Sequence, residues 1–281
     1  MNNHYPKKTV QVSTFNTYRE SDAGKPLVLD VRNLGIDFGG LTAVDSFNVS
    51  LGPTEICGLI GPNGAGKTTI FNLLTGVYQP TRGSVLINGI DTKGMSTHKV
   101  TKLGIARTFQ NIRLFTDMTV LDNVKVGMHN QIKCSFISSM LHLPGYFASE
   151  KKANAKAMEL LAFMGLADLA DQKGGSLPYG VQRRLEIVRA LATNPSIILL
   201  DEPAAGMNPS ETTELMHQIR RIRDTFHIAI FLIEHDMNLV MNVCETIAVL
   251  NYGRLIAKGT PEEIRQNPTV IEAYLGKEDA Q

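Results

Sequence analysis

Short hydrophobic runs alternate with amphipathic segments along the chain, and most runs end in glycine or polar residues. The runs at 55–60, 83–89, 196–202 and 228–236 are short and largely continuous, which is typical of β-strands buried in a sheet. Residues 245–259 predict two further strands around an Asn-Tyr-Gly turn. Strands that alternate with helices indicate an α/β fold with a mainly parallel sheet.

Three other segments carry helical patterns. Residues 67–76 follow the first strand and stop at a glycine, as does the amphipathic stretch 151–165. A further helix is predicted at 176–187, where Pro178 suits the first helical turn because a missing backbone N–H costs nothing there. Its apolar residues recur at helical spacing and are expected to face a core: Val181, Leu185, Val188 and Leu191.

The pattern divides the chain into a tail and one domain. Residues 1–26 are polar and patternless, so we expect a flexible N-terminal tail without a function of its own. Residues 27–281 form the domain. Within it, residues 112–175 lack the recurring short apolar runs that predict strands, so we expect a helical subdomain at about 112–190. Residues 129–147 carry no interpretable pattern.

Composition narrows the class of protein. The 281 residues include 28 basic and 27 acidic side chains, which gives no support for a nucleic-acid surface. No apolar run approaches the ~18 residues of a membrane span, and the N-terminus lacks the apolar region of a secretory signal. We therefore expect a cytosolic protein. The cysteines are far apart and are expected to be buried thiols: Cys57, Cys134 and Cys244.

A glycine-rich loop follows the first predicted strand. Residues 61–68, GPNGAGKT, fit the pattern G-x-x-x-x-G-K-[ST], in which backbone N–H groups surround phosphates. Lys67 would reach the β and γ phosphates, and the Thr68 hydroxyl could ligate Mg²⁺. The nucleotide-binding residues predicted in this segment are Gly61, Pro62, Asn63, Gly64, Ala65, Gly66, Lys67, Thr68 and Thr69.

Polar residues also end two later strands. Asp201 ends an apolar strand and could hold the Mg²⁺ shell, while Glu202 is the candidate that orients and polarises an attacking water. His235 ends another strand and could donate to the γ-phosphate. Ligands of open α/β sheets bind at the carboxyl ends of strands, so these residues are expected to share one site with Lys67.

The helix predicted to start near Pro178 raises a separate question. A helix N-terminus exposes N–H groups and a partial positive charge, so it attracts anions, and Gly180 would let a backbone approach closely. The glycine loop already supplies one phosphate site. The sequence pattern therefore predicts a second anion site without saying which anion it meets.

Taken together, these segments resemble the nucleotide-binding subunit of ABC transporters over roughly residues 27–276. The resemblance implies a P-loop ABC nucleotide-binding domain with a RecA-like core, an antiparallel β subdomain and a helical subdomain. The matching motifs occur in the family's order: Walker A at 61–68, the glutamine loop at Gln110, the signature at 177–181, Walker B at 197–202, the D-loop at 204–208 and the switch histidine at His235.

The resemblance also points to one subfamily of ABC transporters. The chain is similar to the ATP-binding subunit of branched-chain amino-acid importers in the stretches FGGLTAV (38–44), IARTFQNIRLF (105–115), LPYGVQRRLEI (177–187), DEPAAGMNP (201–209), LIEHDM (232–237) and IEAYLG (271–276). This implies that Phe38 stacks on adenine with Val44 beside it. The signature departs from LSGGQ, because Pro178 replaces the serine and Val181 the glutamine; a lost hydroxyl bond to a charged group costs roughly 1.5–3 kcal/mol.

The family resemblance also implies a mechanism. Two subunits would dimerise head to tail, so that Leu177, Tyr179 and Gly180 of one bind the ATP held by the other. Mg²⁺ would be held by Thr68, Gln110 and Asp201. The implied catalytic residues are Glu202, His235 and Gln110, with ATP and Mg²⁺ as cofactors.

The implied partners are separate membrane permeases, a second ABC ATPase subunit (a sister chain or a second copy) and, indirectly, an external solute-binding protein. The chain would then sit peripherally at the cytoplasmic face of the inner membrane and bind no nucleic acid. Two alternatives keep the ATPase: a lipopolysaccharide-export or other-substrate ABC system, and a soluble ABC-type ATPase acting on nucleic acid or ribosomes. A small GTPase is disfavoured because no Asn-Lys-x-Asp motif is present.

Overall fold

A computed structural model describes residues 22–129 and 144–275. Its larger sheet has six strands, and neighbouring strands are parallel except for the β10–β9 pair. In spatial order these strands are β10 (Arg254–Gly259), β9 (Thr246–Asn251), β3 (Ile56–Ile60), β8 (Ala229–Ile233), β7 (Ile197–Asp201) and β6 (Ile105–Arg107). The mainly parallel sheet predicted from the hydrophobic runs is confirmed, but the run predicted at 83–89 lies in the second, antiparallel sheet.

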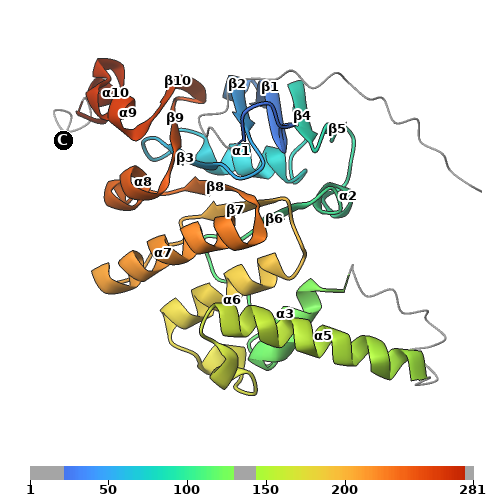
Figure 1. Cartoon of the computed structure of the whole chain (residues 1–281). Helices are drawn as coiled ribbons and strands as arrows, with labels where there is room; N and C mark the ends of the chain where they lie inside the picture. The colour runs from blue at the N-terminus through green and yellow to red at the C-terminus, as the bar shows by residue number, and fades with distance from the viewer. Residues whose placement is uncertain (1–21, 130–143, 276–281) are drawn as a thin grey trace, which may run out of the picture.

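A smaller antiparallel sheet packs beside it (Figure 1). Its four strands, in spatial order, are β2 (Leu41–Leu51), β1 (Leu29–Phe38), β4 (Arg82–Ile87) and β5 (Ile90–Asp91). Register shifts interrupt both pairings of β1. Asn33 and Ser46 take positive φ values within these strands, so the alternation of apolar and polar residues breaks at each of them.

Two hydrophobic cores cover the two faces of the six-stranded sheet. One lies between the two sheets and includes α1 (Lys67–Leu74). The other packs α6 (Tyr179–Leu191), α7 (Pro209–Phe226) and α8 (Met237–Val243) on the opposite face. Alternate residues of one strand enter different cores, as Leu199 and Leu200 do. The sheet therefore separates α1 from α6 (Figure 1).

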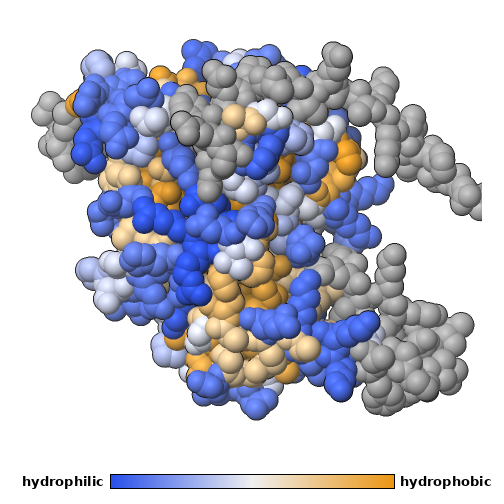
Figure 2. Space-filling view, in the orientation of Figure 1, coloured by the Kyte–Doolittle hydropathy of each residue, from blue (hydrophilic) through white to orange (hydrophobic). Residues whose placement is uncertain are grey.

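The region at about 112–190 contains α3 (Val120–Gly127), α5 (Pro144–Phe163) and α6, with short 3₁₀ turns at Ala167–Leu169 and Gly174–Ser176. Figure 2 shows hydrophobic side chains on the lower half of the visible face, the part of the molecule that carries these helices in Figure 1. The remaining helices are α2 (Thr97–Thr101), α9 (Pro261–Gln266) and α10 (Pro268–Leu275). Within the described residues, no helix is long and apolar enough to cross a membrane.

The described chain begins inside the segment predicted to be a flexible tail. Asp22 is fully buried, and its carboxylate accepts hydrogen bonds from the backbone N and the Oγ1 of Thr54 at 2.7 and 2.8 Å. A buried carboxylate needs such donors. Packing against the domain therefore starts by Asp22, whereas residues 1–21 and most of 129–147 lie outside the described residues.

Two of the three cysteines fall in the described chain. Cys57 and Cys244 are both buried, as the sequence predicts, and burial raises the pKa of the Cys57 thiol to about 12. A thiol with such a pKa stays protonated at neutral pH and is chemically inert. Cys134 lies outside the described residues.

Candidate active site

The Walker A loop joins the carboxyl end of β3 to the start of α1, the context that its sequence pattern requires. At Gly61 the backbone φ is 153°, and a Cβ there would lie 2.1 Å from the carbonyl oxygen of Leu250. Only glycine fits this position. The turn directs successive N–H groups to one side, which forms a cradle of the right kind for phosphates.

The loop residues differ in what they expose. Lys67 is buried, and its Nζ donates to the carbonyl oxygens of Gly61 and Pro62 at 2.7 and 3.0 Å. Asn63 and Thr68 are exposed at the mouth of the loop, and Thr69 is half-buried. The lysine therefore lies over the cradle that phosphates would enter.

Phe38 ends strand β1 with its ring 43% exposed. It meets Tyr78 edge to face, with ring centroids 5.3 Å apart. An exposed aromatic face suits stacking on a base. Val44 is fully buried, so it presents no surface to a base in this structure, and its contact with adenine stays a prediction.

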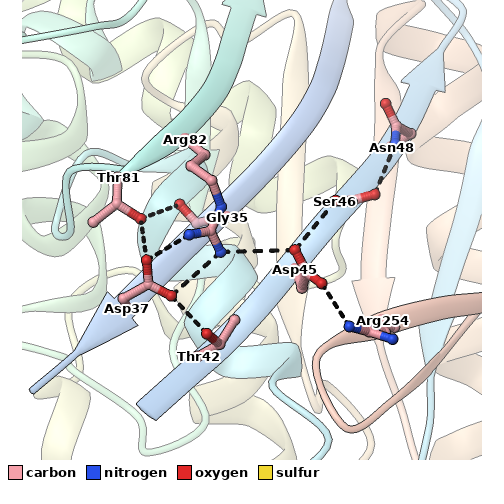
Figure 3. A network of polar contacts seen from close by, with 9 residues as sticks. All are labelled: Gly35, Asp37, Thr42, Asp45, Ser46, Asn48, Thr81, Arg82 and Arg254. Carbon is pink, nitrogen blue, oxygen red and sulfur yellow. Dashed lines mark hydrogen bonds and ion pairs between the residues drawn. The ribbon is translucent and has the colours of Figure 1, made fainter. Parts of the chain in front are cut away.

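A polar network holds the β1–β2 hairpin that carries Phe38 (Figure 3). The Arg82 Nη1 donates to Asp37 Oδ2 at 2.6 Å, and the Arg254 Nη2 lies 2.9 Å from Asp45 Oδ2. Hydrogen bonds from Thr42 and Arg82 lower the pKa of Asp37. The network ties the residue next to Phe38 to β4, and it ties β2 to β10.

The β9–β10 turn connects this hairpin to the Walker A loop. Tyr252 and Gly253 both have positive φ values, as expected for the tight turn predicted from Asn-Tyr-Gly. The backbone N of Asp45 donates to Gly253 O at 2.9 Å, and Gly253 N donates to Ala65 O at 2.8 Å. The hairpin and the phosphate cradle are therefore joined through one turn.

Asp201 is buried at the end of β7, where it forms an ion pair with Arg107. Arg107 Nη2 donates to Asp201 Oδ2 at 2.7 Å, and the two side chains are only 6% and 3% exposed. Arg107 Nη1 donates to Asn72 Oδ1 on α1, also at 2.7 Å. This buried ion pair anchors the Walker B carboxylate to the helix that follows the Walker A loop.

The side chains of Gln110, Glu202 and His235 meet at one carboxylate. Gln110 Nε2 donates to Glu202 Oε2 at 2.8 Å, and His235 Nε2 lies 2.8 Å from Glu202 Oε1. The histidine contact requires a proton on Nε2. Glu202 has a φ of 47°, a left-handed conformation uncommon for a residue other than glycine. The three predicted catalytic residues thus form a single cluster.

Glu234 binds the backbone of residues next to this cluster. Its carboxylate accepts from the backbone N of Ala204 at 2.7 Å and from that of His235 at 3.0 Å, so it ties the D-loop to the switch histidine. Burial raises the pKa of Glu234, and the nearby Glu202 charge adds to the effect, while the backbone N–H donors oppose it. The side chain acts on the cluster through the backbone of its neighbours.

The signature helix, predicted over 176–187, begins at Tyr179 and runs to Leu191. Pro178 is the N-cap of α6, with Tyr179 the first helical residue, because proline's ψ of 150° is not helical. Leu177 is buried, Tyr179 is 45% exposed, and a Cβ on Gly180 would lie 2.9 Å from Glu211 Oε1. The backbone N–H groups of Val181 and Gln182 donate to Pro178 O, both at 3.0 Å, so those of Tyr179 and Gly180 are the ones at the helix end suited to an anion.

Asn208 in the D-loop caps α7. Its Oδ1 accepts from the backbone N of Ser210 and of Glu211, both at 3.0 Å, and Glu211 Oε2 accepts from Asn208 N at 2.9 Å. Asparagine and aspartate cap helices about equally well. Asn208 therefore stabilises the start of α7.

Two family models match the chain. The model described as "ABC transporter" matches residues 44–205, and the model described as "Branched-chain amino acid ATP-binding cassette transporter" matches residues 254–280. The chain belongs to the ABC transporter family. Its predicted fold, a P-loop ABC nucleotide-binding domain, is thereby confirmed, as is its resemblance to ATP-binding subunits of transporters.

This ABC ATPase has curated relatives of nearly equal length. It is 45% identical to the high-affinity branched-chain amino acid transport ATP-binding protein BraF of Pseudomonas aeruginosa, and 47% identical to the corresponding LivG of Escherichia coli. Each alignment covers 89% of this chain and 98% of the relative.

Solved structures share the fold. An ATP-binding cassette of an ABC transporter in its ADP conformation matches with a TM-score of 0.77 and 31% identity, over 89% of this chain and 99% of that one. A nucleotide-free cassette matches with a TM-score of 0.76 and 32% identity, over 88% and 98%.

Several buried polar residues at the site were not predicted. Arg107, Arg183 and Glu186 lie in segments that otherwise look like ordinary strand and helix. Arg107 bonds to Asp201 and Arg183 to the carbonyl of Gln110, while Glu186 pairs with Arg183. A buried charge in an apolar helix pattern is the one signal that sequence offers, since such charges need partners. That signal does not name the partner.

Proposed function

We propose that this ABC ATPase binds and hydrolyses ATP to power the uptake of branched-chain or related hydrophobic amino acids through separate membrane permeases. The observation that carries the ATPase part is the convergence of Gln110 and His235 on the carboxylate of Glu202. The cargo rests on the similarity to BraF and LivG, whose names state branched-chain amino acid transport.

The nucleotide would bind along the edge that joins Phe38 to the Walker A loop. The adenine would stack on the exposed Phe38 ring, and the phosphates would accept from the loop N–H groups. The Nζ of Lys67 would exchange its contacts with the Gly61 and Pro62 carbonyls for phosphate oxygens. The hairpin network and the β9–β10 turn would keep the two ends of the site at a fixed separation.

The donor chemistry fits magnesium. The glycine cradle leaves room for phosphates, and the candidate ligands are all oxygen donors: the Thr68 hydroxyl, the Gln110 carbonyl and the Asp201 carboxylate. Gln110 donates through Nε2 to Glu202, so its Oε1 is the atom suited to a cation. When bound, the ion would neutralise charge on the phosphate oxygens.

Glu202 would orient and polarise the water that attacks the γ-phosphate. Its two oxygens are held by Gln110 and His235, so the carboxylate keeps one orientation. When ATP is bound, His235 would turn its Nε2–H from Glu202 to the γ-phosphate and so complete the site. The Arg107–Asp201 pair would hold the neighbouring carboxylate in place.

The signature helix would serve the ATP of a partner subunit. Within the chain, the start of α6 contacts Glu211 and the D-loop, on the face of the sheet opposite α1. We propose a head-to-tail dimer in which Leu177, Tyr179 and Gly180 of one subunit meet the γ-phosphate held by the other. The second subunit would be a sister chain or another copy.

A groove beside the glutamine loop supports docking of a permease. It has a volume of about 350 Å³ and lies between the sheet edge and the helical subdomain; among its lining residues are Val77, Phe109, Phe115, Val126 and Arg189. The ATPase would thus act peripherally at the cytoplasmic face of the inner membrane. An external solute-binding protein would deliver the amino acid to the permeases.

Partner capture tests this proposal. Tagged Glu202→Gln protein is isolated from detergent-solubilised native membranes with ATP and Mg²⁺, and its partners are identified by mass spectrometry. We expect permeases with several membrane spans and a second, similar ATPase. Lipid-export components would contradict the cargo, and ribosomal or nucleic-acid proteins without membrane partners would contradict the transport role.

A further inference from the structure

Arg183 is the largest fully buried side chain in the described part of the molecule. It lies on α6, one helical turn after Tyr179. A guanidinium in such a place loses its hydration and needs several hydrogen-bond acceptors. Its acceptors therefore show which parts of the structure it was placed to hold.

Those acceptors belong to the two catalytic segments. Arg183 Nη1 donates to Phe109 O at 2.5 Å, and Nη2 donates to Gln110 O at 2.7 Å and to Glu202 O at 3.4 Å. Glu186, on the next turn of the same helix, accepts from Nη1 at 2.9 Å. One guanidinium thus bridges the glutamine loop, Walker B and the signature helix.

Glu186 completes the clamp on the glutamine loop. It is 1% exposed, and its Oε1 lies 3.3 Å from the backbone N of Phe109 and 3.4 Å from that of Arg113. The Arg183–Glu186 pair therefore offers donors to the loop's carbonyl groups and acceptors to its N–H groups. Movement of α6 would carry the loop with it.

Of the three residues whose carbonyls Arg183 binds, two, Gln110 and Glu202, also have side chains that are bonded to each other. Gln110 Nε2 and Glu202 Oε2 are 2.8 Å apart, while Arg183 donates to the backbone carbonyls of both residues. A planar fork of several N–H groups can hold separate carbonyls at fixed spacing, which a lysine ammonium does less well. Arg183 is thus placed to set the orientation of the Glu202 carboxylate.

We infer that Arg183 is a positioning residue that links the two ATP sites of the dimer, an inference that rests on the head-to-tail arrangement of the proposed function. The start of α6 meets the partner's ATP, and Arg183, one turn further, holds the Glu202 of its own site. Because a helical turn is rigid, seating of the partner's γ-phosphate at Tyr179 and Gly180 aligns Glu202 in the chain that carries the helix. Each site then hydrolyses efficiently only when the other is occupied.

The test compares Arg183→Lys with Arg184→Lys in the purified transporter complex. Arg184 is on the same helix but forms a half-exposed pair with Glu214 at 3.1 Å, so it is a matched control. We expect Arg183→Lys to lower kcat roughly 10- to 100-fold, the scale of a small misplacement of a catalytic group. The Hill coefficient for ATP should fall towards one. Binding of an ATP analogue to the isolated chain and the behaviour of Arg184→Lys should stay near wild type.

A combined variant separates positioning from a purely structural role. If Arg183 acts through Glu202, Arg183→Lys added to Glu202→Gln has little further effect on the residual rate. A further loss as large as in the wild-type background would overturn the inference, as would unchanged kcat or an unchanged Hill coefficient in Arg183→Lys. Hydrolysis by the wild-type complex is measured first, so a failure of the proposed function is seen separately.

A second variant covers the case in which Arg183→Lys does not fold. Glu186→Gln keeps an oxygen acceptor for the N–H groups of Phe109 and Arg113 but removes the charge that holds Arg183. We expect a smaller fall in kcat with the same loss of cooperativity. Full cooperativity in a folded Glu186→Gln complex would contradict the link.

Discussion

Replacing Arg107 by methionine would leave the Asp201 carboxylate buried without its ionic partner. The two side chains are 6% and 3% exposed, and the Nη2–Oδ2 distance is 2.7 Å. Removing one member of a buried pair costs about 3–5 kcal/mol, because the remaining charge stays desolvated. For a chain of this size that corresponds to a fall in melting temperature of roughly 6–20 °C. The lost bond to Asn72 on α1 acts in the same direction.

The assay is thermal and urea unfolding of the purified chain, with two companions. Arg184→Met breaks the half-exposed pair with Glu214 and should cost no more than about 1 kcal/mol. Arg107→Met leaves the Asp201 charge without a partner, and Asp201→Asn removes that charge. The loss of unfolding free energy in the double variant should therefore be about 0.5–3 kcal/mol smaller than the sum of the losses in the two single variants. Additive effects, or an Arg107→Met loss as small as that of Arg184→Met, would contradict a buried, energetically coupled ion pair.

Three further predictions concern single side chains. Lys67→Ala should abolish detectable nucleotide binding in a titration with a fluorescent ATP analogue, and affinity close to wild type would remove the lysine from the phosphate site. Phe38→Ala should weaken that binding by roughly 3- to 10-fold and Phe38→Tyr by much less, because stacking is worth about 0.5–1.5 kcal/mol; equal losses would contradict base stacking. Burial raises the pKa of Glu234, so its protonated form stabilises the fold at low pH, and that contribution is lost as pH rises from the ordinary carboxyl pKa through the raised one. The unfolding free energy of the wild type minus that of Glu234→Gln should fall as the pH rises through this range. If that difference rises instead, the pKa of Glu234 is lowered by folding and not raised.

The strands of the parallel sheet were predictable because both of their faces are buried. Continuous apolar runs such as 197–201 and 229–233 have no polar alternation to obscure them. Strands β1 and β2 were not predicted. Asn33 and Ser46 have positive φ values, so the apolar residues on either side of them do not follow a single alternation of apolar and polar positions.

The candidate site was predictable only in part, for a different reason. The Walker A loop is local, so its spacing in sequence determines its shape. The bonds of Glu202 to Gln110 and His235 join positions far apart in sequence, and only the strand-end argument and the family resemblance brought them together beforehand. Arg107 and Arg183 bond to carboxylate and backbone atoms that are distant in sequence and come close only in the folded chain.

We propose that Glu202, held by Gln110 and His235, drives the ATP hydrolysis that powers amino-acid uptake. The most direct measurement is ATP hydrolysis and leucine uptake by the purified complex in liposomes, comparing wild type with Glu202→Gln. We expect Glu202→Gln still to bind ATP while hydrolysis falls by about two to four orders of magnitude, and uptake to fall with it. A Glu202→Gln complex that hydrolyses ATP at the wild-type rate would contradict the assignment of the catalytic carboxylate.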